Sequence, residues 1–86
     1  MNRLLIELIL DLAAFLELSG EDTIREDAAV NQLEWISWKL KQLPPDERAE
    51  FIKYTEEYAE AAQRNRERRA YIEFLRSFAE DAGLND

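Results

Sequence analysis

The chain has 86 residues, of which 19 are acidic and 11 basic, giving a formal net charge of −8 at neutral pH. It contains neither cysteine nor histidine, which excludes disulfides, thiolate catalysis and zinc–thiolate sites and removes the commonest general base. Because 47% of the residues are hydrophobic and only two are glycine and two proline, the composition predicts one small all-α domain. We expect no enzyme activity, no cofactor and no metal.

The first predicted helix covers residues 2–18, with Ser19-Gly20 expected to supply a left-handed cap. Its apolar positions span roughly 200° of the helical circumference, about twice what a surface helix needs. Two sides of this helix therefore have to be buried. Either the helix lies at the centre of its own bundle, or one side packs against another chain. Acidic residues interrupt the apolar run: Glu7, Asp11 and Glu17. We therefore expect neither a membrane span nor a signal peptide, and a cytoplasmic protein.

The second predicted helix covers residues 25–43. Its expected core face is a stripe of apolar side chains at helical spacing: Ala29, Leu33, Ile36, Leu40 and Leu43. Trp35 and Trp38 lie roughly 130–180° away from the centre of that stripe. Two interpretations remain open. The indoles either pack under another helix of the same chain or anchor a partner protein, because tryptophan is strongly enriched among binding hot spots.

The clearest local signal is the pair Pro44-Pro45. Proline ends the preceding helix and is favoured in the first turn of the next, where its missing N–H costs nothing. We therefore expect a third helix from residue 45. A helical pattern continues to Ala82, and Gly83 followed by Leu84 has the form of a Schellman cap.

This third stretch of about 38 residues is far longer than a typical helix. The apolar side chains of residues 45–62 and those of residues 66–82 centre on opposite sides of the helical circumference. Between them, residues 63–69 carry no apolar side chain. The chain either breaks near residues 63–66 and folds a fourth helix back, or continues as one helix shared with a second copy. The predicted fold is an all-α bundle of three to four helices.

Two clusters of charged residues bear on whether the protein binds a metal or nucleic acid. Glu56, Glu57 and Glu60 gather on the third helix, but a di-metal bundle would need histidines that the chain lacks, so they predict a solvated acidic face. The arginine-rich residues 63–76 suggest nucleic acid, but a net charge of −8 opposes binding to a polyanion. We expect these arginines to pair with acidic residues of a neighbouring helix or of a partner, and expect no nucleic-acid binding.

Part of the chain resembles short bacterial proteins of uncharacterised or immunity type. The similar phrases are Asp27-Ala28-Ala29-Val30, Leu33-Glu34-Trp35-Ile36 and Leu43-Pro44-Pro45-Asp46-Glu47-Arg48-Ala49-Glu50-Phe51. Immunity proteins are encoded beside secreted toxins and neutralise them by binding. The resemblance implies a non-catalytic antitoxin and assigns no site residues.

Charge, size and the lack of catalytic residue types agree with that expectation. They predict an immunity-type inhibitor that covers a basic surface of a partner toxin, since a net charge of this size steers association with basic surfaces. The alternative is a homo-oligomeric helical adaptor or structural protein, with the first or the last helix at a dimer interface. The predicted partner-binding residues are Trp35, Trp38, Glu56, Glu57 and Glu60.

Overall fold

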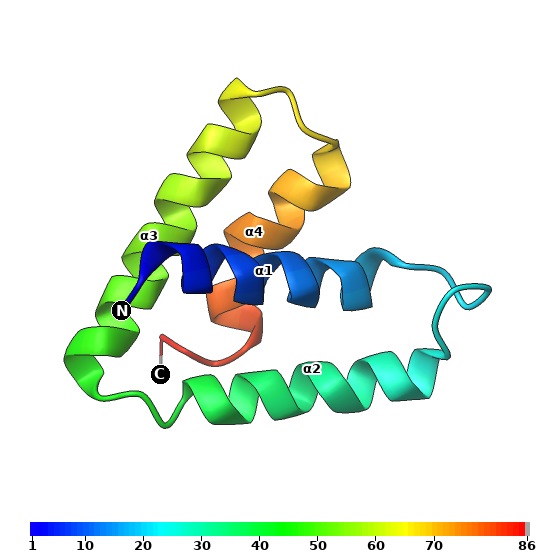
Figure 1. The fold of residues 1–86 in the computed structure, drawn as a ribbon, viewed down its shortest axis with the longest axis horizontal. Coiled ribbons are helices and arrows are strands. Elements are labelled where there is room, and N and C mark those ends of the chain that lie inside the picture. Colours follow the sequence, from blue (N-terminus) through cyan, green and yellow to red (C-terminus); the bar gives the residue numbers. More distant parts are fainter. Residues whose placement is uncertain (86) are drawn as a thin grey trace.

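A computed structural model of the chain describes residues 1–85 (Figure 1). Its helices are α1 (Arg3–Leu18), α2 (Glu26–Leu40), α3 (Pro45–Arg64) and α4 (Arg69–Asp81). Within the described residues there is no strand, so the predicted all-α bundle is confirmed. Residues 1–85 form four helices, because the chain breaks between α3 and α4 instead of continuing as one long helix.

Local sequence signals set the starts of α1 and α3. The side-chain oxygen of Asn2 accepts hydrogen bonds from the backbone N–H groups of Leu4 and Leu5, at 2.7 and 3.4 Å. These bonds satisfy two of the donors that a helix leaves unpaired in its first turn. α3 begins at Pro45, as expected, because proline has no N–H to leave unpaired there.

The expected left-handed cap at the end of α1 is wrong. Ser19 is extended, with φ −76° and ψ 143°, and Gly20 does not have a positive φ. The carbonyl of Gly20 instead starts a new turn by accepting the N–H groups of Thr23 and Ile24, at 2.9 and 3.0 Å. The chain therefore leaves α1 in an extended conformation and turns again before α2.

α2 ends at Leu40, three residues earlier than the sequence predicted. The N–H of Leu43 donates to the carbonyl of Leu40 at 3.1 Å, which is the spacing of a turn. Because Pro44 follows, Leu43 is sterically disfavoured from the α-helical conformation. The effect of Pro44 therefore reaches further than Leu43, the residue that it directly restricts, because α2 already ends at Leu40.

α3 closes with a Schellman motif that contains no glycine. The N–H of Glu67 donates to the carbonyl of Ala62 at 3.0 Å, and that of Arg66 to Gln63 at 3.1 Å. Arg66 is left-handed, with φ 57°, a conformation that costs most residues with a Cβ roughly 1 kcal/mol or more. Because Arg68 is then extended (φ −59°, ψ 141°), α4 begins three residues later than the predicted residue 66.

The cap predicted after α4 is confirmed. Gly83 has φ 74°, and its N–H donates to Glu80 while that of Leu84 donates to Ala79, at 3.0 and 2.9 Å. Leu84 is 2% exposed. The turn therefore folds one more apolar side chain back into the core, as Schellman motifs commonly do.

α1 lies at the centre of the bundle and contacts each of the other three helices. In Figure 1 it crosses in front of α3 and α4, with α2 running alongside. The α2 stripe predicted from the sequence faces the core, with Ala29 and Leu40 buried. The most deeply buried large side chains come from the other three helices: Ile6, Leu10, Phe51 and Leu75. Since α2 packs mainly on α1, the space between α2 and α4 is left open.

Candidate protein-docking surfaces

The first candidate surface is one side of α1. Within residues 1–85, nine large hydrophobic side chains are exposed, and five of them share this side of the helix. We call it the α1 apolar face; its members are Leu4, which is 73% exposed, and Leu5, Leu8, Leu12 and Phe15, which are 52–54% exposed. Residues three or four positions apart lie in line on a helix. α1 is therefore central in its own bundle and still leaves a second apolar side uncovered.

Two of the acidic residues of α1, Glu7 and Asp11, lie along one edge of this face, where tyrosines bind them. Tyr54 donates a hydrogen bond to Glu7 at 2.5 Å, and Tyr58 donates to both carboxylate oxygens of Asp11, at 3.1 and 3.2 Å. Tyr71 of α4 also donates to Asp11. We call these five residues the tyrosine clamp. It ties α1 to α3 and α4 and holds both carboxylates at the margin of the apolar face.

The clamp raises the pKa of all three phenols above the ordinary value of 10. For Tyr54 the main cause is its hydrogen bond to the Glu7 carboxylate, which makes loss of the phenol proton unfavourable. For Tyr58 and Tyr71 the main cause is burial, with the Asp11 hydrogen bond adding to it. The tyrosines therefore remain neutral donors at physiological pH.

The second candidate feature is the tryptophan pair of α2. Trp35 and Trp38 are each 53% exposed, so the interpretation that they pack under another helix is wrong. Their rings stack on each other, with centroids 5.1 Å apart and planes 22° from parallel. The ammonium group of Lys39 lies 5.3 and 5.8 Å from the two ring centroids, within cation–π range. The pair is thus a preorganised aromatic platform on the surface.

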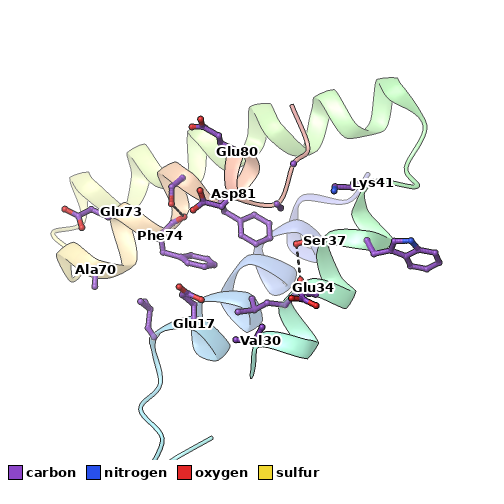
Figure 2. Close-up of a pocket in the computed structure, with 17 residues that line it drawn as sticks. Glu17, Val30, Glu34, Ser37, Lys41, Ala70, Glu73, Phe74, Glu80 and Asp81 are labelled. Carbon is purple, nitrogen blue, oxygen red and sulfur yellow. Dashed lines mark hydrogen bonds between the residues drawn. The ribbon is translucent and has the colours of Figure 1, made fainter. Parts of the chain in front are cut away.

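The third candidate surface is the groove between α2 and α4, with a volume of about 910 Å³. Figure 2 shows Phe74 of α4 directed into this space, with Val30 and Ser37 of α2 on the other side. We call it the α2–α4 groove. Its apolar lining comes from three helices: Leu18, Val30, Leu33, Trp38, Phe74 and Phe78.

The groove carries a strong negative charge. Among residues 1–85, five carboxylates line it against one ammonium group, that of Lys41, and one of the five, Glu73, is also paired with Arg69. The carboxylates belong to Glu17, Glu34, Glu73, Glu80 and Asp81, and Figure 2 shows them around the apolar lining. An apolar floor with an acidic margin favours a ligand that is apolar on one side and basic at its edges.

Of the partner-binding residues predicted from the sequence, only Trp38 lies in the groove. Trp35 stacks on it from outside. The predicted acidic residues of α3 are exposed, on the side of α3 opposite its buried residues, and do not line the groove: Glu56, Glu57 and Glu60. The structure therefore keeps the tryptophans and this acidic cluster on different helices.

Sequence reasoning missed the acidic residues that do line the groove. Glu73 and Glu80 are seven positions apart on α4, so they lie on one side of that helix, next to Phe74. That spacing was a usable signal. The sequence could not show that Glu34 of α2 faces the same space.

The arginine-rich segment lies at the turn between α3 and α4. Arg69 pairs with Glu73 of its own helix at 3.0 Å, and both side chains are largely exposed. Arg76 donates a hydrogen bond to Gln63 of α3. Within residues 1–85, none of these arginines forms the predicted ion pair with a neighbouring helix.

Neither a metal site nor a membrane span is found in the described part of the chain. Residues 1–85 hold no group of three or more acidic side chains placed to bind a metal ion. No helix in this described part is both long enough and apolar enough to cross a bilayer. What the surface offers chemically is apolar area and carboxylates, which suit recognition of another molecule.

Comparison of the chain with protein-family models, with curated proteins and with solved structures found no match.

Proposed function

We propose that this protein is a non-catalytic inhibitor of the immunity type, which binds a basic, amphipathic segment of a partner toxin in the α2–α4 groove. The observation that carries the proposal is the combination of an apolar lining with five carboxylates in one open groove. The resemblance of the phrases in residues 27–36 and 43–51 to short bacterial proteins of uncharacterised or immunity type suggests the biological setting.

The shape of the groove favours a helix as the bound element. Its walls are two helices, and its lining includes aromatic and branched side chains from both. Amphipathic helices commonly bind in this way, with anchors on one side inserted between two helices of the receptor. Basic residues at the edges of such a segment would meet Glu34 on one wall and Glu73 and Asp81 on the other.

Charge selects the partner and speeds the encounter. The groove acids belong to a chain with a net charge of −8, whose field attracts basic surfaces from a distance. Complementary charge contributes mainly to association rate and partner choice, while apolar contacts hold the complex together. A bound inhibitor of this size would act by covering the basic surface that the toxin needs for its own activity.

Trp38 is the expected anchor of the complex. It lines the groove while half exposed, and stacking on Trp35 holds its ring in place. Truncating an aromatic anchor typically costs about 2 kcal/mol of binding free energy or more. We therefore expect Trp38→Ala to weaken binding roughly thirtyfold or more.

The direct test uses a synthetic amphipathic helix of leucine, lysine and arginine as the probe and tryptophan fluorescence as the readout. The variant Glu34→Gln/Glu73→Gln/Asp81→Asn removes three negative charges from the groove. The control Glu56→Gln/Glu57→Gln/Glu60→Gln removes three from α3. We expect weaker binding only for the groove variant. Equal losses would indicate non-specific charge attraction, and a loss confined to the α3 variant would assign binding to α3.

The biological test is a growth assay with the toxin gene adjacent to the gene for this protein. Co-expression of the wild-type protein should rescue growth, and the groove variant should rescue less well than the α3 control variant. If deletion of the gene is harmless while the neighbouring toxin is active, the inhibitor function is wrong.

A further inference from the structure

We propose that two copies of this protein associate through their α1 apolar faces, in an antiparallel dimer with twofold symmetry. This surface is separate from the α2–α4 groove, and the inference does not rest on the proposed function. It rests on the area of the face, on its lack of charge and on the spacing of its side chains.

The exposed area is at the limit of what a single chain usually shows. At half exposure or more, the five side chains leave on the order of 500 Å² of apolar surface uncovered per copy, the upper end for soluble monomers. Two such faces would together remove on the order of 1,000 Å² from water, the size at which specific interfaces begin. A second copy therefore supplies a cover of the required size.

The absence of charged side chains from the α1 apolar face indicates that its binding partner is a second copy of this chain. Two chains with a net charge of −8 each repel one another. They can therefore pack together only through surfaces on which neither chain has a carboxylate. No charged side chain is among the five members of the α1 apolar face, and in the described chain the nearby carboxylates of Glu7 and Asp11 are bound by the tyrosine clamp. The groove has five carboxylates and would repel its own copy.

A lipid surface fits this face poorly. Helices that lie in a membrane interface usually carry lysine or arginine beside their apolar side, to bind anionic headgroups. Beside this face lie the two carboxylates Glu7 and Asp11 and a single basic residue, Arg3, whose guanidinium group lies over the ring of Tyr54 at 5.1 Å; the chain as a whole is acidic. Charge thus argues against a membrane and leaves the identical, uncharged face of another copy as its complement.

The spacing of the side chains suits antiparallel helix packing. Leu4, Leu8, Leu12 and Phe15 follow one another at intervals of four, four and three residues, which forms a continuous ridge along the helix. A twofold axis between residues 8 and 12 would place Leu8 of one copy against Leu12 of the other. Such an isologous contact closes on itself, so it yields a dimer and no larger assembly.

Sedimentation equilibrium tests the proposal over protein concentrations from about 1 to about 300 μM. The wild-type chain should show a dimer whose share rises with concentration. Leu8→Glu and Leu12→Lys should each raise the dissociation constant by about 100-fold or more, because they place an uncompensated charge in an apolar contact. Ala28→Glu, which adds the same charge at an exposed residue of α2 outside the groove, should leave it unchanged.

An equimolar mixture of the Leu8→Glu and Leu12→Lys chains tests the register. The antiparallel arrangement places the two new charges in contact, so the mixture should form a heterodimer, although each variant alone is monomeric. Circular dichroism should show wild-type helix content for both variants, and a mixture of two folded variants that stays monomeric overturns the register. A wild-type chain that is monomeric at every concentration overturns the dimer.

Discussion

The α1 apolar face and the α2–α4 groove contain the same kinds of side chain but differ in the charges around them. The α1 face is a ridge of leucines and a phenylalanine with no charged member, whereas the groove brings five carboxylates to the edge of its apolar lining. Exposed apolar area alone marks a surface only as a candidate for binding. The surrounding charge then separates a self-complementary face from one that favours a basic partner.

The difference arises from the way α2 is attached. On α1 the nearest acids are held by tyrosines of α3 and α4, which keeps charge away from the outer side of the helix. α2 packs on α1 and stands apart from α4, so acidic residues from three elements surround the space that remains. The same bundle thus produces an uncharged ridge and an acidic groove.

The largest expected effect is on the free energy of unfolding, and it should distinguish the buried side of α1 from its exposed side. Leu10 is fully buried and Leu12 is 54% exposed on the same helix. Leu10→Ala should lower the free energy of unfolding by about 2–5 kcal/mol, whereas Leu12→Ala should change it by less than about 0.5 kcal/mol in the monomer. Urea denaturation at low protein concentration measures both. A large loss for Leu12→Ala would mean that this face belongs to the core.

Salt should act on the two surfaces in opposite directions. Raising the salt concentration from about 50 to about 500 mM should weaken binding of the basic peptide to the groove roughly tenfold or more, because exposed charges are screened. The same change should leave the α1 dimer unchanged or tighter, since screening reduces repulsion between two acidic chains. Titrations of both equilibria at matched salt provide the measurement. Parallel responses would contradict the assignment of different partners to the two surfaces.

The tyrosine clamp predicts a loss of stability at alkaline pH. Because the pKa values of Tyr54, Tyr58 and Tyr71 are raised in the folded chain, the unfolded chain releases phenol protons first as the pH rises above 10. Folding then becomes less favourable with increasing pH, while below pH 10 both states are protonated and the contribution is fully present. Urea denaturation between pH 8 and pH 11 should show this decline.

Replacing one phenol of the clamp provides the control for that decline. Tyr71→Phe keeps the ring but removes the ionisable group, so the slope of stability against pH above 10 should become shallower. The variant should also be less stable than the wild type at pH 8, because the hydrogen bond to Asp11 is lost. An unchanged slope would mean that Tyr71 does not contribute to the alkaline effect.

The smallest expected effect concerns the turn that returns α4 to the bundle and so forms one wall of the groove. Arg66 is left-handed with φ 57°, where glycine is the preferred residue. Arg66→Gly should raise the free energy of unfolding by about 0.5–1 kcal/mol, after allowing for the greater freedom of glycine in the unfolded chain. The complementary change Gly83→Ala, at φ 74°, should lower it by about 1 kcal/mol. Peptide binding in the groove should not change with Arg66→Gly.

Much of the fold was predictable because its signals are local. The start of α3 at Pro45 and the cap at Gly83 each depend on a few neighbouring residues, and the structure confirms both. The sequence left open whether the chain breaks after α3 or continues as one helix, and the structure shows the break. The left-handed cap at Ser19-Gly20 was wrong, because the carbonyl of Gly20 is used in the next turn instead. Helix ends, where several local hydrogen-bond patterns compete, were the least predictable part.

The candidate site was less predictable than the fold. The sequence pointed to Trp38, because two tryptophans on the side of a helix away from its core stripe are unusual. It also selected Glu56, Glu57 and Glu60 by their closeness in sequence, whereas the groove acids come from three separate helices, α1, α2 and α4. A cluster along the chain is visible in a sequence, but a cluster assembled from separate helices is not.

The positions of the helices and the apolar side of each follow from local sequence, because backbone hydrogen bonding, caps and periodicity act over a few residues. Which apolar sides stay uncovered depends instead on how the helices pack. Whether a leucine of α1 meets another helix or water depends on where α3 and α4 are placed, and that placement results from the packing of residues distant in the chain. Burial is a property of the assembled bundle, and so are the two surfaces that we propose for binding.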